Sequence, residues 1–294
     1  MNYGKIYAII IVSKLVLCKR MKNYKSYVQE CTERTVIKMK KFLALAMASV
    51  IAMATLLSGC GPTPKAPEAP VNETASVIKM GTNAAFPPYE FKEGEEFKGI
   101  DVEIAEAIAK ELGVELEIVD MEFDSIITSV QKGEVDFGMA GMTVTDERKE
   151  EVDFTSSYAT GVQVVIVAED SEIATLDDLE GKKIGTQLGT TGDIYSKDDY
   201  GEENVVSYSK GADAVIALKG GDVDAVIIDN EPAKAFVADN EGLKILDTEY
   251  AIEDYAIAIS KDNTELLDKI NAALEKLTAD GTIDAIIATY INAE

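Results

Sequence analysis

The 294-residue chain contains no histidine and only three cysteines, Cys18, Cys31 and Cys60. Without histidine, Ser-His and Cys-His catalysis and histidine-ligated metal sites are excluded. All three cysteines lie in the first 60 residues, so the rest of the sequence holds neither a disulfide nor a cysteine cluster for zinc. We therefore expect no metal, no cofactor and no catalytic residues of these types.

Positive charge is scarce, and arginine is the scarcest form of it. The first 60 residues hold 10 of the 28 basic and 2 of the 53 acidic residues, which leaves the remainder with a formal charge of −33. A surface of this sign repels nucleic acid and anionic lipid headgroups, so we expect no nucleic acid partner. Arg148 is the only arginine after residue 34, among 17 lysines. Its position needs a specific explanation.

Residues 39–60 have the layout of a secretory signal. Lys40 and Lys41 precede the apolar run Phe42–Leu57, and small residues lead to Cys60. The segment "LSGC" resembles the lipobox of a bacterial lipoprotein signal peptide, which implies that Cys60 is lipidated and becomes the new N-terminus. An ordinary transmembrane anchor is the alternative, although the run is short for one.

The segments on either side of this signal have different compositions. Residues 1–38 contain a shorter apolar run broken by Lys14, and we interpret them as an over-extended start, with a genuine membrane segment as the alternative. Residues 61–76 hold four of the seven prolines, which predicts an extended, solvated tether. Together with a lipidated cysteine, the tether would hold the globular part just outside a membrane.

Strand and helix patterns alternate in the globular part. Strand-like segments at 77–82, 114–120 and 135–140 enclose helical patterns at 101–113 and 124–133. This alternation predicts an α/β fold with mostly parallel sheets.

One pattern of helix, glycine, acidic residue, Val-Asp and strand occurs twice. It is "ITSVQKGEVDFGMAG", ending at Gly141, and "VIALKGGDVDAVIID", ending at Asp229. Ligands bind beyond the carboxyl ends of strands in open α/β sheets, so two such lobes facing each other would share one cleft. A coincidental likeness of two βαβ units is the alternative.

Five segments, in order, resemble the amino-acid-binding extracellular proteins of ABC importers (solute-binding family 3). They are "GTNAAFPPYEF", "GIDVEIAEAIAKELG", "MEFDSIITSVQKGEVDFGMAGMTVTDERKEEVDFT", "IGTQLGTTGD" and "GDVDAVIIDNEP". The resemblance covers about residues 77–292. It implies a type II periplasmic-binding-protein fold, in which two α/β lobes joined by two hinge strands enclose a ligand cleft. The implied boundaries are lobe one at 77–158 and 256–292, lobe two at 163–250, and hinges at Tyr158–Val162 and Ala251–Tyr255.

The resemblance also explains Arg148, which corresponds to the family's clamp for the ligand α-carboxylate. A guanidinium offers a planar fork that matches a carboxylate, and lysine cannot do this. Thr143 would give its hydroxyl or N–H to the same carboxylate. The alternative for Arg148 is a surface ion pair with Glu147 or Glu151.

Further ligand contacts are implied at both strand ends. Gly141 would offer its carbonyl and Asp229 its carboxylate to the ligand ammonium, although Asp229, or Asn230 in its place, is also a candidate helix N-cap. Gly189, Thr190 and Thr191 lie at the start of a predicted helix and would aim backbone N–H groups at the carboxylate. The alternative is that this segment is a capped helix start without a role in binding.

The ligand side chain is expected between aromatic rings and two amides. Phe86 and Phe123 correspond to the family's enclosing aromatics, with Tyr89 as a further wall and core packing as the alternative. Asn83 and Gln187 occupy the positions that contact the far end of the side chain. Both can donate and accept, so an uncharged polar side chain fits at least as well as a cationic one, and an acidic one fits least.

We therefore expect a monomer that binds a polar or basic amino acid, closes around it and delivers it to an ABC permease and its ATPase. No reaction is expected. A dehydratase-like enzyme of the same fold would need a general acid such as Glu90, Glu122 or Glu231. The sequence also leaves open a ligand-presenting sensor and an adhesin.

Overall fold

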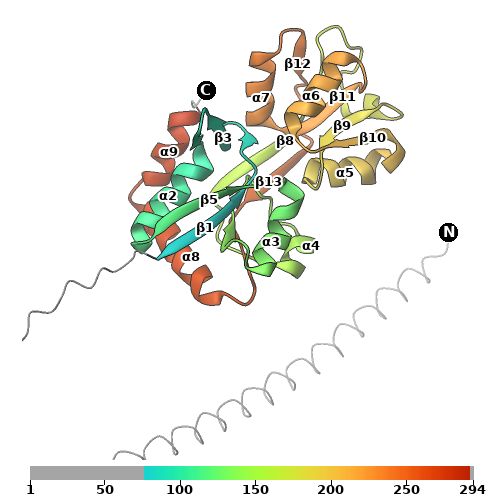
Figure 1. Ribbon diagram of the computed structural model, residues 1–294. Helices are drawn as coiled ribbons and strands as arrows, with labels where there is room; N and C mark the ends of the chain where they lie inside the picture. Colours follow the sequence, from blue (N-terminus) through green and yellow to red (C-terminus); the bar gives the residue numbers. More distant parts are fainter. Residues whose placement is uncertain (1–75, 292–294) are drawn as a thin grey trace, which may run out of the picture. The chain divides into compact units, whose positions relative to one another are not determined.

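A computed structural model describes residues 76–291 (Figure 1). The predictions for the start of the chain, for the signal with Cys60 and for nearly all of the tether lie outside these residues. Among residues 76–291, no helix is both long and apolar enough to cross a membrane.

The first lobe is built on a mixed sheet with the strand order β5-β1-β6-β14-β7. Its strands are β1 Val77–Thr82, β5 Glu115–Asp120, β6 Phe137–Gly138, β7 Asp153–Phe154 and β14 Ala258–Ile259. Strand β1 pairs in parallel with β5 and β6, whereas β14 runs antiparallel to β6 and β7. A strand from far along the chain therefore completes this sheet.

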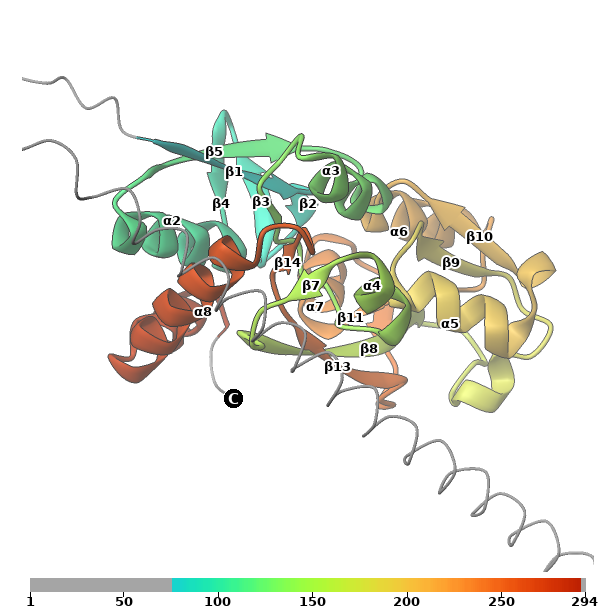
Figure 2. The same ribbon diagram turned by 90° about the horizontal axis from the view of Figure 1, so that it is seen from below.

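Helices cover both faces of the first sheet. Helix α2 (Ile100–Leu112) lies beside α8 (Thr264–Ala279) (Figure 2) and also packs with α9 (Thr282–Tyr290). These helices share a core with Ile78 and Met80 of β1. A second core gathers apolar side chains of α3 (Ile126–Lys132), with the 3₁₀ turn Phe123–Ser125 before it. The remaining elements are β2 Ala85–Phe86, β3 Glu90–Glu93, β4 Glu96–Lys98 and α4 Asp146–Glu151.

The second lobe is built on the sheet β10-β9-β11-β8-β12, with β13 also paired to β8. Its strands are β8 Ala159–Ala168, β9 Ile184–Gln187, β10 Val205–Tyr208, β11 Ala225–Asp229, β12 Leu243–Ile245 and β13 Ala251–Tyr255. Its helices are α5 Thr191–Tyr200, α6 Gly211–Gly220 and α7 Asn230–Asp239, with 3₁₀ turns at Leu176–Leu179 and Glu202–Asn204. Two apolar cores lie on the two faces, because alternate side chains of β8 belong to different clusters.

Strands β8 and β13 run side by side where the chain passes between the lobes (Figure 1). They are antiparallel, with Ala159 opposite Tyr255 and Gln163 opposite Ala251. The predicted hinge segments fall on this pair, although the lobe boundaries themselves stay a prediction.

The expectation of mostly parallel sheets is wrong in part. The pairs β1–β5, β1–β6, β9–β10 and β9–β11 are parallel, but every pair that involves β8 or β14 is antiparallel. The reason is connectivity. Parallel neighbours arise from βαβ crossovers, whereas β8 and β14 follow the passages of the chain between the lobes.

The repeated motif forms matching structures. Helices α3 and α6 end at Gly133 and Gly221, whose φ angles of 69° and 76° are left-handed. Glycine adopts these angles without a Cβ penalty. Each helix is followed by a strand, β6 or β11, that is parallel to a neighbouring strand of its own sheet.

Candidate functional site

A pocket of about 330 Å³ receives side chains from both lobes. Nine of the predicted ligand residues line it: Asn83, Phe86, Phe123, Gly141, Thr143, Arg148, Gln187, Thr190 and Thr191. Asp229, Gly189 and Tyr89 were also predicted to contact the ligand, and they do not line it. Four further residues complete the lining: Glu90, Ala140, Gln163 and Tyr255.

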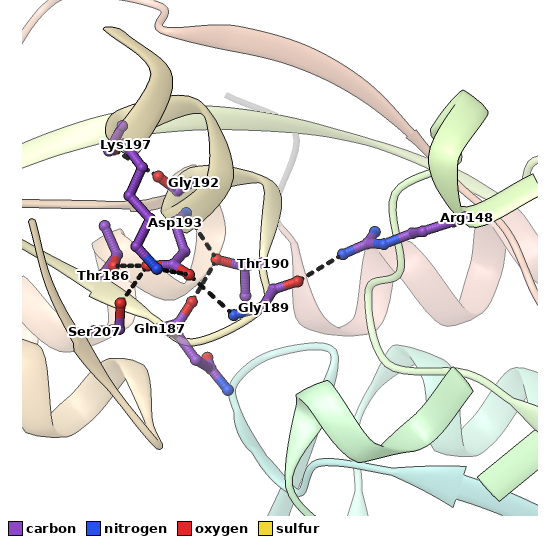
Figure 3. Close-up of polar contacts among 10 residues, drawn as sticks. Arg148, Thr186, Gln187, Gly189, Thr190, Gly192, Asp193, Lys197 and Ser207 are labelled. Atoms are coloured by element: carbon purple, nitrogen blue, oxygen red, sulfur yellow. Dashed lines mark hydrogen bonds and ion pairs between the residues drawn. The ribbon is translucent and has the colours of Figure 1, made fainter. Parts of the chain in front are cut away.

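Arg148 lines this pocket as a buried side chain that is only 8 % exposed. Thr145 caps α4 by accepting the Arg148 N–H, which fixes the helix that carries the side chain. Nη1 donates to the Thr143 carbonyl at 2.6 Å. Nη2 donates to the Gly189 carbonyl of the second lobe at 3.0 Å (Figure 3). The guanidinium carbon lies 5.4 Å from the centre of the Phe123 ring, within the range of a cation–π contact.

The alternative of a surface ion pair for Arg148 is wrong. Glu147 and Glu151 are both exposed, and neither forms an ion pair with Arg148 in the described part of the chain. Burial lowers the pKa of the guanidinium, and the charge of Glu253 opposes that shift.

Asp193 holds the loop that accepts from Arg148 (Figure 3). Its Oδ2 accepts from the Gly189 N–H at 3.2 Å and from Lys197 at 2.8 Å, and its Oδ1 accepts from Thr186 and Ser207. Burial alone would raise the pKa of Asp193, but these donors outweigh it and the pKa is lowered. By accepting from these four donors, the Asp193 carboxylate holds the loop before α5 in place.

Thr190 is the N-cap of α5, because its hydroxyl accepts the Asp193 N–H at 3.2 Å. The expected capped helix start is therefore present. It places Thr190 and Thr191 in the pocket wall. Two of the three predicted backbone donors are taken, because the Gly189 N–H donates to Asp193 Oδ2 and the Thr190 N–H donates to the Gln187 carbonyl. Contact of the Thr191 N–H with a ligand stays a prediction.

Asn83 and Gln187 bind each other across the pocket. Gln187 Nε2 donates to Asn83 Oδ1 at 3.0 Å and to the Ser209 carbonyl at 3.3 Å. Asn83 Nδ2 donates to the Met121 carbonyl at 2.7 Å. The protein's own carbonyls and the Asn83 oxygen take both N–H groups of Gln187 and one of the two N–H groups of Asn83, so the pair offers a ligand its amide oxygens and one remaining N–H of Asn83.

The aromatic residues divide into lining and support. Phe86 lines the pocket, and its ring stacks on Tyr89 with centroids 5.9 Å apart. Tyr89 is 2 % exposed and belongs to the core of the first lobe, so it supports Phe86 from behind and forms no wall of its own. The core-packing alternative applies in part to Phe123, which is 9 % exposed and belongs to a core cluster of the first lobe while it also lines the pocket.

Asp229 has its carboxylate occupied by protein donors. Oδ1 accepts the Glu231 N–H at 3.1 Å as the N-cap of α7, and Oδ2 accepts from the Val162 N–H at 3.0 Å and the Tyr255 hydroxyl at 2.8 Å. The N-cap alternative is thus present in the structure, and Asp229 rather than Asn230 fills it. Contact of Asp229 with a ligand ammonium stays a prediction.

Comparison with known proteins identifies the family. Residues 78–293 match the bacterial extracellular solute-binding proteins, family 3. The chain belongs to this family. The solute-binding protein is 36 % identical to the arginine-binding extracellular protein ArtP of Bacillus subtilis (strain 168), over 87 % of this chain and 100 % of the relative.

Solved structures of similar solute-binding proteins share the fold. An ancestral arginine-binding protein bound to arginine is 42 % identical, with a TM-score of 0.70, and the match covers 74 % of this chain and 99 % of that one. The arginine-, lysine-, histidine-binding protein ArtJ from Geobacillus stearothermophilus is 33 % identical, with a TM-score of 0.71, over 74 % and 96 %. The predicted family, the two-lobed α/β fold and the function of an extracellular amino-acid-binding protein of an ABC transporter are confirmed at this level.

Two buried carboxyl groups lie beside the pocket of the solute-binding protein. Glu90 lines it at 1 % exposure, and Asp101 is fully buried. Asp101 Oδ2 accepts from the Gly141 N–H at 2.8 Å and from the Tyr158 hydroxyl at 2.9 Å. Burial raises the pKa of Asp101 to about 7, and burial together with the charge of Asp101 raises the pKa of Glu90 well above its usual value.

These raised pKa values give the solute-binding protein a predictable response to pH. An unfolded aspartate titrates near 4, whereas native Asp101 titrates at about 7. Between these values the native state retains a proton that the unfolded state has lost, so the contribution of Asp101 to stability is full below about pH 4 and is lost as the pH rises through 7. The free energy of unfolding of Asp101→Asn, minus that of the wild type, should therefore increase as the pH is raised from 5 to 8.

Urea denaturation of both proteins at the two pH values measures this difference. The asparagine oxygen can still accept from Gly141 and Tyr158, so the variant keeps the local contacts. Parallel pH profiles for the two proteins would show that Asp101 does not titrate in this range.

Proposed function

We propose that the protein binds an amino acid whose side chain ends in N–H donors, with L-arginine and L-glutamine as the first candidates. The observation that carries this proposal is the arrangement of the pocket. The buried arginine Arg148 lies at one end, and the oxygens of the Asn83–Gln187 pair are available elsewhere in the lining.

The chemistry of each group supports this orientation. Arg148 keeps N–H groups beyond the two that bind carbonyls, and a guanidinium fork matches an α-carboxylate. A ligand side chain that ends in a guanidinium or a primary amide supplies N–H donors for the oxygens of the Asn83–Gln187 pair. An acidic side chain would meet these oxygens and the buried carboxyls of Glu90 and Asp101 without a basic partner.

The relatives agree with this choice of ligand. ArtP is named for arginine, and one ancestral arginine-binding protein is described both with arginine and with glutamine bound. The side chains of both ligands end in N–H donors, but only arginine is charged. The two neutral amides of the pocket do not select between a charged and an uncharged side chain.

Thermal denaturation of the fragment 77–294 against the twenty amino acids tests the proposal. A ligand that binds only the folded state raises the melting temperature. We expect the largest shifts with arginine or glutamine and no shift with aspartate or glutamate. A largest shift with an acidic amino acid, or no shift with any of the twenty, would contradict the proposal.

In the proposed cycle, the two lobes close around the ligand by hinge bending at β8 and β13, and the closed form presents it to the permease. The protein acts as a monomer and catalyses no reaction. Of the three glutamates considered for a dehydratase, only Glu90 lines the pocket. Its raised pKa has a structural cause in burial and in the neighbouring Asp101.

A lipid on Cys60 is the proposed anchor to the membrane. The support is the signal-like segment that ends in "LSGC" and the proline-rich tether after it. The mass of the N-terminal peptide from membrane-extracted protein measures the modification. An unmodified Cys60 in that peptide would rule the anchor out.

A further inference from the structure

Glu253 is a buried carboxylate directly behind the wall of the pocket. It lies on β13, is 5 % exposed, and pairs in register with Gly161 of β8. Its Oε2 accepts from Thr191 Oγ1 at 2.9 Å, from Thr143 Oγ1 at 3.0 Å and from Gln163 Nε2 at 3.1 Å. All three donor residues line the pocket. One carboxylate oxygen thus gathers side chains from both lobes and from a linking strand.

The count of protons decides what the two threonines can offer a ligand. A hydroxyl has one proton to donate and two lone pairs, and a carboxylate only accepts. Thr143 and Thr191 therefore direct their protons to Glu253 and retain lone pairs as acceptors. Their oxygens lie 3.5 Å apart, close enough to accept together from one small donor group.

The charges nearby match the two ends of an amino acid. Glu253 is the largest source of the charge effect that raises the pKa of Arg148 against burial. The negative Glu253 and the positive Arg148 thus act on the same part of the pocket. The zwitterionic end of an amino acid, with its ammonium and its carboxylate, matches these two charges. Arg148 suits the carboxylate, and two hydroxyl oxygens backed by Glu253 suit the ammonium.

Acceptor capacity also favours Glu253 over Asp229 for this task. Both oxygens of Asp229 already accept from protein donors, three in all. By contrast, Glu253 Oε1 is buried and has no hydrogen-bond partner among the described residues. A buried carboxylate oxygen normally has a donor, so Glu253 keeps acceptor capacity that its contacts with Thr143, Thr191 and Gln163 do not use.

We propose that Glu253 is a positioning residue for the ligand α-ammonium, which it serves by holding the Thr143 and Thr191 hydroxyls with their lone pairs toward the pocket. The inference rests on the proposed function and adds to it the way in which the α-ammonium of the ligand is recognised. The hydroxyl of Thr143 serves the ammonium, and its backbone N–H is left for the carboxylate.

Glu253→Gln tests this role, because glutamine keeps the size of the side chain and removes the charge that orients both hydroxyls. Calorimetric titration with L-arginine and with 5-guanidinopentanoate, which is arginine without its α-ammonium, separates the ammonium from the rest of the ligand. We expect arginine to bind at least about tenfold more weakly, which is about 1.4 kcal/mol. We expect the analogue to change less than threefold. The ratio of the two affinities within one protein cancels a folding defect that weakens both.

Asp254→Asn is the matched control, because Asp254 is the next residue on the same strand and is exposed. It removes one negative charge and should leave both affinities within twofold of wild type. An equal loss for the two compounds in Glu253→Gln, no loss, or tighter binding of arginine would each overturn the inference. Failure of the wild-type protein to bind arginine is a separate result, which would overturn the proposed ligand and the inference with it.

Discussion

Arg148→Ala should weaken amino acid binding by at least about thirtyfold. The variant leaves the ligand carboxylate without its cationic partner, and truncating one partner of a buried charge pair costs about 2–5 kcal/mol. Each 1.4 kcal/mol is about tenfold in affinity. Arg148→Lys keeps the charge but loses the fork, so we expect a smaller, still measurable loss. The variants should also lose some stability, because Thr143 and Gly189 lose the donor to their carbonyls.

Calorimetric titration of L-arginine into wild type and both variants measures the effect. Lys149→Ala is the control, because Lys149 is the next residue on α4, is exposed, and pairs only locally with Asp146. It should bind within threefold of wild type. Binding of Arg148→Ala within the same threefold range would show that Arg148 does not clamp the carboxylate.

Gly99→Ala should lower the free energy of unfolding by at least about 3 kcal/mol. Gly99 precedes α2 with a φ of 124° and a ψ of 173°, a region that only glycine occupies readily and that costs other residues about 1–3 kcal/mol. An added Cβ would also lie 2.2 Å from the Tyr89 carbonyl oxygen. The backbone must therefore move, at the point where the N–H groups of Ile100 and Asp101 bind the carbonyls of Pro88 and Tyr89.

Gly94→Ala provides the matched control for this stability effect. Gly94 also has a positive φ, 66°, but a Cβ there meets no atom within 4 Å. It should cost only the conformational penalty, about 1–2 kcal/mol. Urea denaturation of both variants compares them. Equal losses would show that the close approach to Tyr89 contributes nothing.

Most of the residues that the family resemblance named from the sequence line one pocket, and their role in binding stays a prediction. Arg148 was identifiable because it is isolated among lysines, and the helix that carries it begins at a threonine cap. The ends of the two repeated strands were identifiable because glycine stops and apolar runs mark them. In each case a local signal of a few residues determines the position.

Besides Glu90 and Ala140, the residues of the pocket and its surroundings that were missed lie on the paired strands between the lobes. Gln163, Glu253 and Tyr255 point inward from β8 and β13, and no local signal distinguishes them from exposed polar residues of a strand. Their orientation depends on the register of β8 against β13, which joins residues about 90 apart in the chain. The partners of Asp229 were missed for the same reason, because Tyr255 approaches it from β13.

The order of the strands in the first sheet also sets the order in which the chain can fold. Strands β6 and β7 are neighbours only through β14, which lies between them and comes from Ala258–Ile259. In the sheet of the second lobe, the sequences of strands β8 to β12 are complete at Ile245, and that of β13 is complete at Tyr255. As the chain emerges from N- to C-terminus, the second lobe can therefore complete its sheet while β6 and β7 still expose unpaired edges. Those edges must avoid pairing with other chains until the last segment arrives, together with α8 and α9 that cover the core of the first lobe.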